Sequence, residues 1–301
     1  MRKGHFEILD FRFEISILYS PFSNRCVIIC RHFIKRRFPM LKTTLFLHNL
    51  SLVLYTLAAV YSTAALFVHR LPLFVGRLTG LAGVVAQLVL LVWRWNAGSH
   101  LPVTGLFETQ HFLALWVAAV AVYFSFRYRA DSFMPAAMTL TVASLLFAGK
   151  GPMDVAPLTP AIDTPLFLIH VATSFAAYGM FGIAALMAVY RTMDWPGSPM
   201  RNERRMMDES LYIGYILFTW AMIAGSIWAY LAWGSYWTWR IKGLWSWILW
   251  FYYSGVLHVR NRHRWQGWPL NILAMAGFAL VLFTYLGLGL LFTTSHPLLP
   301  E

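Results

Sequence analysis

The chain has few charged residues for its length. Only 12% of its 301 residues are Asp, Glu, Lys or Arg, whereas a soluble globular domain carries roughly 25%. Hydrophobic residues make up 59%, and the mean hydropathy is +0.58. This composition leaves too little polar surface to cover a soluble fold, so it excludes an ordinary soluble domain.

Cysteine is almost absent. The two cysteines are Cys26 and Cys30, their spacing is not C-x-x-C, and no thiol occurs from Met40 onward. Disulfide chemistry performed by the chain itself is therefore not expected.

Internal repeats, low-complexity tracts and an evident nucleophile or acid–base dyad are also missing. The missing repeat argues against a typical transporter, because many transporters are built from inverted repeats. The missing dyad argues against an enzyme that acts alone.

Long apolar runs are abundant. They are continuous instead of alternating, which favours helices over a membrane barrel. Each span needs about 20 mostly apolar residues. We predict an all-α, polytopic transmembrane bundle of about eight spans, near residues 44–68, 78–95, 110–127, 132–149, 165–190, 211–232, 246–260 and 269–292. The second and seventh are the shortest.

The distribution of Lys and Arg predicts the orientation, because cytoplasmic loops carry an excess of both. If both ends of the eight-span domain lie on one side, one set of loops holds eleven of these residues and the other, counted from Met40, holds five. The eleven-residue side is predicted to be cytoplasmic. The outer face then contains residues 95–109, 150–164, 233–245 and 293–301. Inner arginines contribute to the net charge of +12, so no nucleic-acid partner is inferred.

Residues 1–39 do not fit this pattern. They carry eight Lys or Arg, which would reverse the bias if they lay outside. They also lack a clean apolar stretch of signal-peptide length. We predict that translation starts at Met40, that residues 1–39 are a disordered, mis-called extension, and that residues 40–301 form the transmembrane domain. The alternative is a basic cytoplasmic tail, which requires an odd number of spans.

Tryptophans are concentrated in one outer segment. Eight of the fourteen lie between Trp220 and Trp250. One interpretation is an interfacial aromatic belt, since indole rings favour the headgroup region. The other is a broad, flat, apolar platform for a planar ligand, which would explain why five of them crowd one short loop: Trp233, Trp237, Trp239, Trp245 and Trp247.

The segment from Trp233 to His258 resembles the tryptophan-rich WWD signature of the cytochrome c assembly protein family, in its CcsA/ResC/CcsB-type branch. The positions in register are Trp233, Gly234, Trp237, Trp239, Lys242, Trp245, Ile248, Trp250, Leu257 and His258. Further similarity lies at His100, Pro102 and Glu108, at the histidine-led run from Leu168, and from Tyr285 to His296. The resemblance covers most of residues 45–296.

The segment departs from the family pattern at two positions. Arg240 stands where the family has Asp, and Gly243 where it has Glu. A guanidinium at this position could pair with a heme propionate. The departure also leaves open a divergent, HemX-like branch associated with tetrapyrrole synthesis.

The resemblance implies roles for three histidines as ligands of heme iron. His170 and His296 match the external pair, which would hold a heme on the outer tryptophan surface. His258 matches a histidine that binds a heme within the bilayer, with His48 or a histidine of a partner subunit opposite it. The alternative for each is an ordinary hydrogen-bonded or terminal histidine. The heme-contacting residues implied with them are Trp233, Trp237, Trp239, Trp245, Trp250 and Arg240.

The other histidines receive weaker interpretations. His100 and the carboxylate of Glu108 are expected to stabilise an outer loop or touch the heme edge. His111 and His69 are interpreted as interface histidines, and His5, His32 and His263 are given no role.

The function implied by the resemblance is the handling of heme b and its presentation outside for attachment to apocytochrome c. The implied partner is a ResB/CcsB-like membrane protein, and the chain would be a subunit of a cytochrome c synthase (heme lyase) complex in a bacterial plasma membrane. The alternatives are a HemX-like regulator of tetrapyrrole metabolism and a transporter of another apolar ligand.

Overall fold

The computed structural model describes residues 24–68, 70–103, 105–129, 131–155, 158–193 and 200–287. The side chains of residues 24–39, 200–201 and 263 lie outside this description. His5, His32, His69 and His296 are therefore not placed.

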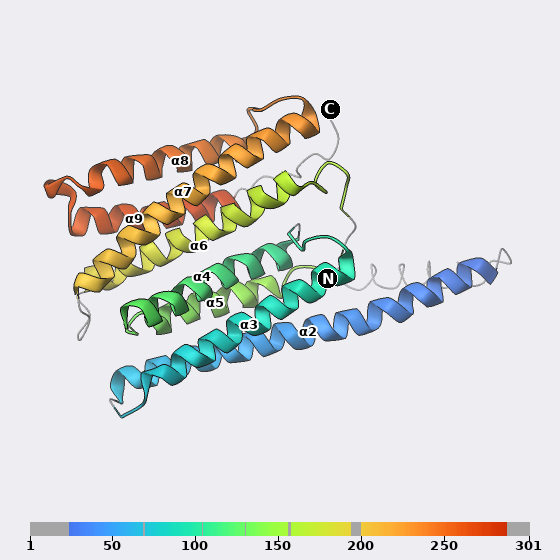
Figure 1. Cartoon of the computed structure of the whole chain (residues 1–301), viewed down its shortest axis with the longest axis horizontal. Helices are drawn as coiled ribbons and strands as arrows, with labels where there is room; N and C mark the ends of the chain where they lie inside the picture. The colour runs from blue at the N-terminus through green and yellow to red at the C-terminus, as the bar shows by residue number, and fades with distance from the viewer. Residues whose placement is uncertain are drawn as a thin grey trace, which may run out of the picture. The chain divides into compact units, whose positions relative to one another are not determined.

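The described residues are helical and contain no strand, which confirms the all-α prediction (Figure 1). The helices are α2 (Asn24–Phe67), α3 (Leu73–Gly98), α4 (Leu106–Tyr128), α5 (Met134–Ala148), α6 (Pro165–Met193), α7 (Met200–Trp233), α8 (Ile241–Arg260) and α9 (Trp268–Leu282). A 3-10 turn, His263–Trp265, precedes α9, and a π turn, Phe283–Gly287, follows it.

The chain divides into two compact units, residues 1–45 and 46–301. The backbone of residues 24–39 is helical, while the prediction that translation begins at Met40 stays a prediction. Within the second unit the helices run alongside one another and successive helices reverse direction (Figure 1).

Six of these helices are long and apolar enough to cross a membrane: Met40–Phe67, Leu73–Gly98, Leu106–Tyr128, Pro165–Met193, Asn202–Trp233 and Trp268–Gly287. A shorter apolar helix, Met134–Ala148, matches the fourth predicted span. α8 covers the seventh, and it is a helix of 20 residues. Each of the eight predicted spans therefore corresponds to a helix, and the chain is a multi-pass membrane protein.

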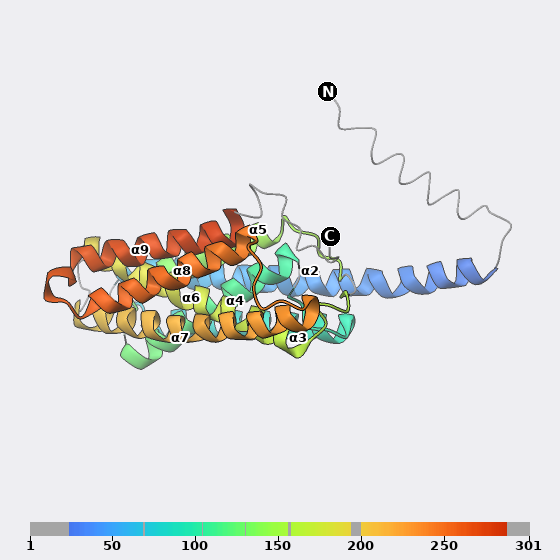
Figure 2. The same ribbon diagram turned by 90° about the horizontal axis from the view of Figure 1, so that it is seen from above.

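α4 is the central helix of the second unit. Of its most apolar stretch 72% is buried, against 28% for the span in α2. α4 packs against α3, α5 and α6, and α6 packs along α7 and α9. Gly179 of α6 lets α4 approach closely, because a Cβ there would lie 2.6 Å from the Cβ of Trp116. α8 lies beside α7 and α9 (Figure 2).

The reversing helices give the bundle two ends. We call the end with the connections 99–105, 149–164 and 234–240 the tryptophan end. The end with the connections 68–72, 129–133 and 261–267 is the arginine end. Three predicted outer loops, 95–109, 150–164 and 233–245, lie at the tryptophan end; the fourth outer segment, 293–301, lies outside the described residues.

Candidate functional site

The tryptophan-rich connection is fixed onto the last turns of α7. Gly234 has a φ of 73°, in the region that favours glycine, and its N–H donates to the carbonyl of Tyr230 at 2.8 Å. The ring of Tyr236 then stacks on that of Tyr230 at 4.2 Å, and Ser226 donates to the carbonyl of Tyr236. These contacts give the connection one defined path from α7 to α8.

Three of the predicted indoles form a cluster with Trp247. Trp237 meets Trp239 at 5.8 Å and Trp247 at 5.9 Å, and Trp247 meets Trp250 at 5.8 Å. The interplanar angles are 84°, 77° and 71°. The rings therefore meet edge to face. The platform interpretation predicts a flat surface, and these rings do not lie in one plane. Trp239 is 82% exposed and is the indole most available to a ligand.

The other two predicted indoles lie in separate contacts. Trp245 packs against Phe283, which follows α9, at 4.7 Å. Trp233 packs against Trp228 at 4.7 Å. The tryptophans of the segment therefore lie in three contacts: the cluster around Trp247, the pair of Trp245 with Phe283 and the pair of Trp233 with Trp228.

Arg240 is the exposed cation of the segment. Its guanidinium carbon lies 5.9 Å from the centre of the Trp233 ring, a cation–π distance. Lys242, two residues later, is half-buried, and this burial lowers the pKa of its ammonium group. A guanidinium keeps its charge and offers a planar set of donors, so Arg240 is suited to a carboxylate ligand.

His170 lies near the start of α6, held against α7. Its Nδ1 is 2.8 Å from the carbonyl oxygen of Ala221. A carbonyl only accepts hydrogen bonds, so Nδ1 carries the proton and Nε2 keeps a lone pair. No hydrogen bond to Nε2 occurs among the described residues. Metal-binding histidines usually have this second hydrogen bond to a carbonyl or carboxylate, and neutral imidazole is a ligand of heme iron.

Trp228 connects His170 to the tryptophan-rich connection. Its ring is stacked with the imidazole at 6.3 Å and 15°, and its Nε1 donates to the carbonyl of Ala161 at 2.7 Å. The ring of Phe167 also packs against that of Trp228, at 4.8 Å. Sequence reasoning counted Trp228 among the crowded tryptophans but gave it no role. The available signal was its spacing of three residues from Gly225, which places both on one face of α7.

Gly225 lets His170 approach α7. A Cβ at this position would lie 2.5 Å from Nδ1 of His170, so any side chain here displaces the imidazole from the Ala221 carbonyl.

If His170 binds heme as the resemblance implies, we predict that Gly225→Ala lowers the heme affinity about 10–100-fold, the usual effect of disturbing the support of a metal ligand. Heme titration followed by absorbance measures this. Ile227→Ala is the matched control, because Ile227 is exposed on the same helix. Equal affinities of the Gly225→Ala variant and the wild type would refute the positioning role.

His258 lies in the last turn of α8, at the arginine end, and its side chain is exposed. It lines a cavity of 370 Å³ together with Val259, Arg262, Arg264 and Trp265. His258 is therefore separated from His170, which lies at the other end of the bundle. This separation agrees with two distinct histidine sites.

His48 is not placed to act opposite His258. Its Nδ1 lies 3.0 Å from Nε2 of His111, and both rings pack on Phe107, near the tryptophan end. His111 also contacts Gln87, whose amide nitrogen donates to the His111 carbonyl at 2.8 Å. The side chain of His111, interpreted from the sequence as an interface histidine, is completely buried among protein side chains. Two helices, α2 and α4, are joined by this imidazole pair.

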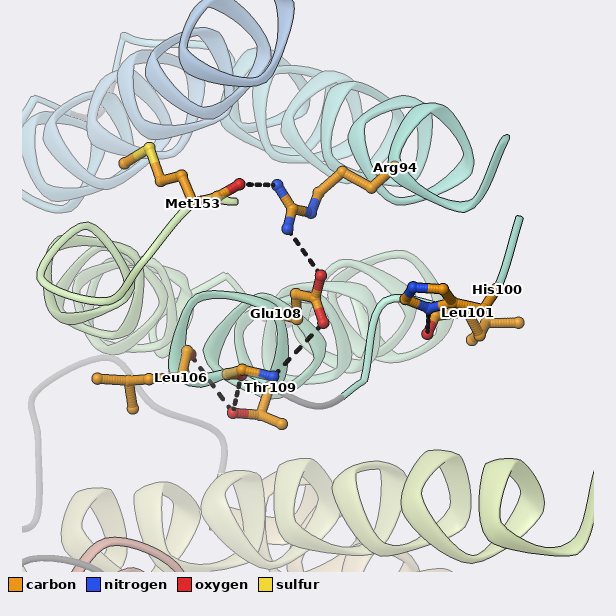
Figure 3. A network of polar contacts seen from close by, with 8 residues as sticks. Arg94, His100, Leu101, Leu106, Glu108, Thr109 and Met153 are labelled. Carbon is orange, nitrogen blue, oxygen red and sulfur yellow. Dashed lines mark hydrogen bonds and ion pairs between the residues drawn. The ribbon is translucent and has the colours of Figure 1, made fainter. Parts of the chain in front are cut away.

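Glu108 forms a buried ion pair that the sequence did not predict (Figure 3). Its Oε1 accepts from Nη2 of Arg94 at 2.7 Å, while Nη1 of Arg94 donates to the carbonyl of Met153 at 2.7 Å. The other oxygen of Glu108 faces the N–H of Gly105 at the start of α4. Glu108 lies in the first turn of α4 and not in the outer loop where it was predicted, and its ion pair joins α4 to α3.

His100 lines a second cavity, of 230 Å³, at the tryptophan end. Asp163, Phe167 and Leu168, which precede His170 in the chain, also line it. Among the described residues there is no cluster of three or more His, Cys, Asp or Glu that could hold a metal ion. The arrangement instead offers single imidazoles, which suit the axial positions of a heme iron.

The fold and the site define a multi-pass helical membrane protein that carries an oriented histidine and a tryptophan cluster at one end of its bundle. Residues 103–296, more than half of the chain, match the family of the cytochrome c assembly protein. The chain belongs to this family.

Curated relatives agree with this assignment. Cytochrome c biogenesis protein CcsA of Prochlorococcus marinus (strain MIT 9312) is 27% identical over 242 residues, covering 68% of this chain and 78% of the relative. The protein of the same name from Synechococcus sp. (strain RCC307) is 28% identical over 255 residues, covering 71% and 82%.

A solved structure shows the same fold. The cytochrome c heme lyase CcmF aligns with a TM-score of 0.63 at 17% identity. The alignment covers 86% of this chain but only 52% of the lyase, so the chain spans about half the length of that protein.

Proposed function

We propose that the chain binds heme b at the tryptophan end and presents it for covalent attachment to apocytochrome c. The observation that carries this proposal is the orientation of His170, whose Nε2 lone pair is left available by the hydrogen bond from Nδ1 to Ala221. The relatives named for cytochrome c biogenesis support the same process. They do not favour a HemX-like regulator or a transporter of another ligand.

The tryptophan end is proposed to lie on the outer, periplasmic face of a bacterial plasma membrane. The bias of Lys and Arg toward the opposite loops supports this orientation. The carboxyl-terminal segment would then be outside as well.

Different residues of the tryptophan end are proposed to bind the iron, the ring and the propionates of heme. His170 and, from the family resemblance, His296 are proposed as the two axial ligands; His296 lies outside the described residues. Trp239 and its cluster offer aromatic surface, and Arg240 offers a cation for a propionate. Trp233, Trp245 and Trp250 support these positions through their own packing.

Heme supplies the vinyl groups to which the thiols of an apocytochrome add. The chain has no thiol from Met40 onward, so its role is to bind and orient. We propose that it acts with a ResB/CcsB-like membrane partner, as a subunit of a cytochrome c synthase and not as an enzyme alone.

The experiment that tests the function has two measurements. The purified chain, washed and reduced, is expected to show the absorption spectrum of a heme with two imidazole ligands. Deleting the gene is expected to abolish covalent heme attachment to cytochrome c, and restoring it should bring attachment back. Normal cytochrome c after deletion would favour a regulator or transporter and refute the proposal.

A further inference from the structure

The cavity at the arginine end carries two arginines that the proposed function does not use. Its 370 Å³ are lined by His258, Val259, Arg262, Arg264 and Trp265. These residues combine an imidazole, two guanidinium groups and an indole, with no carboxylate among them. Such a lining suits a planar, apolar molecule that bears two negative charges.

The charge of the neighbouring Arg260 is already balanced, in contrast to these two arginines. Its Nε lies 3.8 Å from an oxygen of Asp208, and its guanidinium is stacked 3.8 Å from the centre of the Tyr212 ring. The side chains of Arg262 and Arg264 are exposed and make no hydrogen bond or ion pair within the part of the chain that the structure describes. Two arginines with no ion-pair partner among the described residues thus line the same cavity as His258.

The surface of α8 beside His258 is also unusually open. Trp247, Phe251, Gly255 and His258 follow one another at helical spacing, and each is exposed. A Cβ added to Gly255 would meet no atom within 4 Å. Glycine inside a helix costs about 1 kcal/mol relative to alanine, and no packing within the described residues requires it here.

The position of Gly255 matches the direction of the His258 side chain. Side chains of a helix lean toward its N-terminus, so the imidazole leans over the turn that contains Gly255. The missing side chain leaves this turn free for a flat molecule bound to the imidazole. Arg262 and Arg264 follow on the other side of His258, where they can reach charged groups at its edge.

We propose that Arg262 and Arg264 bind the two carboxylates of the porphyrin whose iron is bound by His258, and that Gly255 leaves the space for its ring. This inference rests on the proposed heme function and on the heme-ligand role that the family resemblance implies for His258, and it assigns three further residues to that second heme. The arginine end then selects a porphyrin dicarboxylate by charge.

The test compares hemin with hemin dimethyl ester, whose two carboxylates are neutral. Both are titrated into the full chain carrying His170→Ala, in an uncharged detergent, and followed by heme absorbance. With both arginines present, hemin should bind more tightly than the ester by about tenfold for each charge-assisted contact. The additional change R262Q with R264Q should remove this preference and leave the affinity for the ester unchanged.

The matched control is R127Q with R129Q. Both residues are exposed at the same end of the bundle, so this pair removes the same surface charge away from the cavity. It should preserve the preference for hemin. Gly255→Leu should weaken hemin and the ester alike, while Gly255→Ala should have a smaller effect; size-exclusion chromatography and thermal melting verify that each variant is folded.

Several outcomes would overturn the inference. One is an unchanged preference for hemin in the R262Q/R264Q variant. Another is an R262Q/R264Q variant that loses only its binding to phosphatidylglycerol vesicles. The two arginines would then contact lipid headgroups instead of a porphyrin. A third is unchanged hemin binding when His258→Ala is added. In all three cases the proposed function at His170 can still hold, because it is measured separately by cytochrome c maturation.

Discussion

The variant His170→Ala is expected to lose heme from the tryptophan end and to stop covalent heme attachment to cytochrome c. The imidazole of His170 is held by a carbonyl of the neighbouring helix α7, that of Ala221, whereas Nδ1 of His100 lies 3.1 Å from the carbonyl of the next residue in the chain, Leu101. Combining the change with His296→Ala should remove any remaining binding there. The measurements are the heme content of the purified protein and the amount of heme-bound cytochrome c in cells.

Loss of a ligand can be distinguished from loss of the fold. The variant gives up one hydrogen bond to Ala221, worth about 1 kcal/mol, so its thermal melting should change little. Added imidazole should restore part of the heme spectrum of His170→Ala, since it can occupy the vacated ligand position. Ile169→Ala, an exposed neighbour on α6, is the control and should retain normal heme content. Full cytochrome c maturation in the His170→Ala strain would contradict the ligand role.

The second large effect is expected at the ion pair between Arg94 and Glu108. Both side chains are buried, with 0% and 5% of their surface exposed, and the pair joins the end of α3 to the start of α4. Arg94→Leu leaves the buried carboxylate of Glu108 without its cation, which should destabilise the protein by about 3–5 kcal/mol. The midpoint of thermal unfolding in detergent measures this loss.

A second change can separate the charge from the packing. Adding Glu108→Leu to Arg94→Leu removes the stranded carboxylate and should recover much of the stability, because buried ion pairs can often be replaced by apolar residues. The control is Arg205→Leu, which breaks the exposed pair with Glu209 and should cost no more than about 1 kcal/mol. If Arg94→Leu and Arg205→Leu were equally stable, the buried pair would have no special role.

Much of the fold could be predicted from local patterns. A membrane-spanning helix needs a continuous apolar run that matches the thickness of the bilayer, and such runs are visible along the chain. The helix α6 begins at Pro165, the residue at which its span was predicted to begin. The helices α7 and α8 begin at Met200 and Ile241, before the predicted spans, because their first turns contain charged or polar residues that precede the apolar runs.

The site was predicted only in part. The tryptophan crowding between Trp220 and Trp250 and the histidine at 170 were evident from the chain. The role of Trp228 was missed, because its contact with His170 depends on how α6 and α7 lie against each other. His48 was offered as a partner of His258, yet it lies beside His111, and helical periodicity alone does not say which helices become neighbours.

The sequence by itself determined that the chain is helical, that it crosses a membrane many times, and that its tryptophans gather beside one set of helix ends. These properties follow from the apolar length of each segment and from the order of residues within it. Only the tertiary structure decided that Arg94 meets Glu108, that Gly225 lets His170 reach a carbonyl, and that His258 shares a cavity with two arginines. Each of these contacts requires a particular lateral packing or a turn between elements, which the spacing of residues along one helix cannot specify.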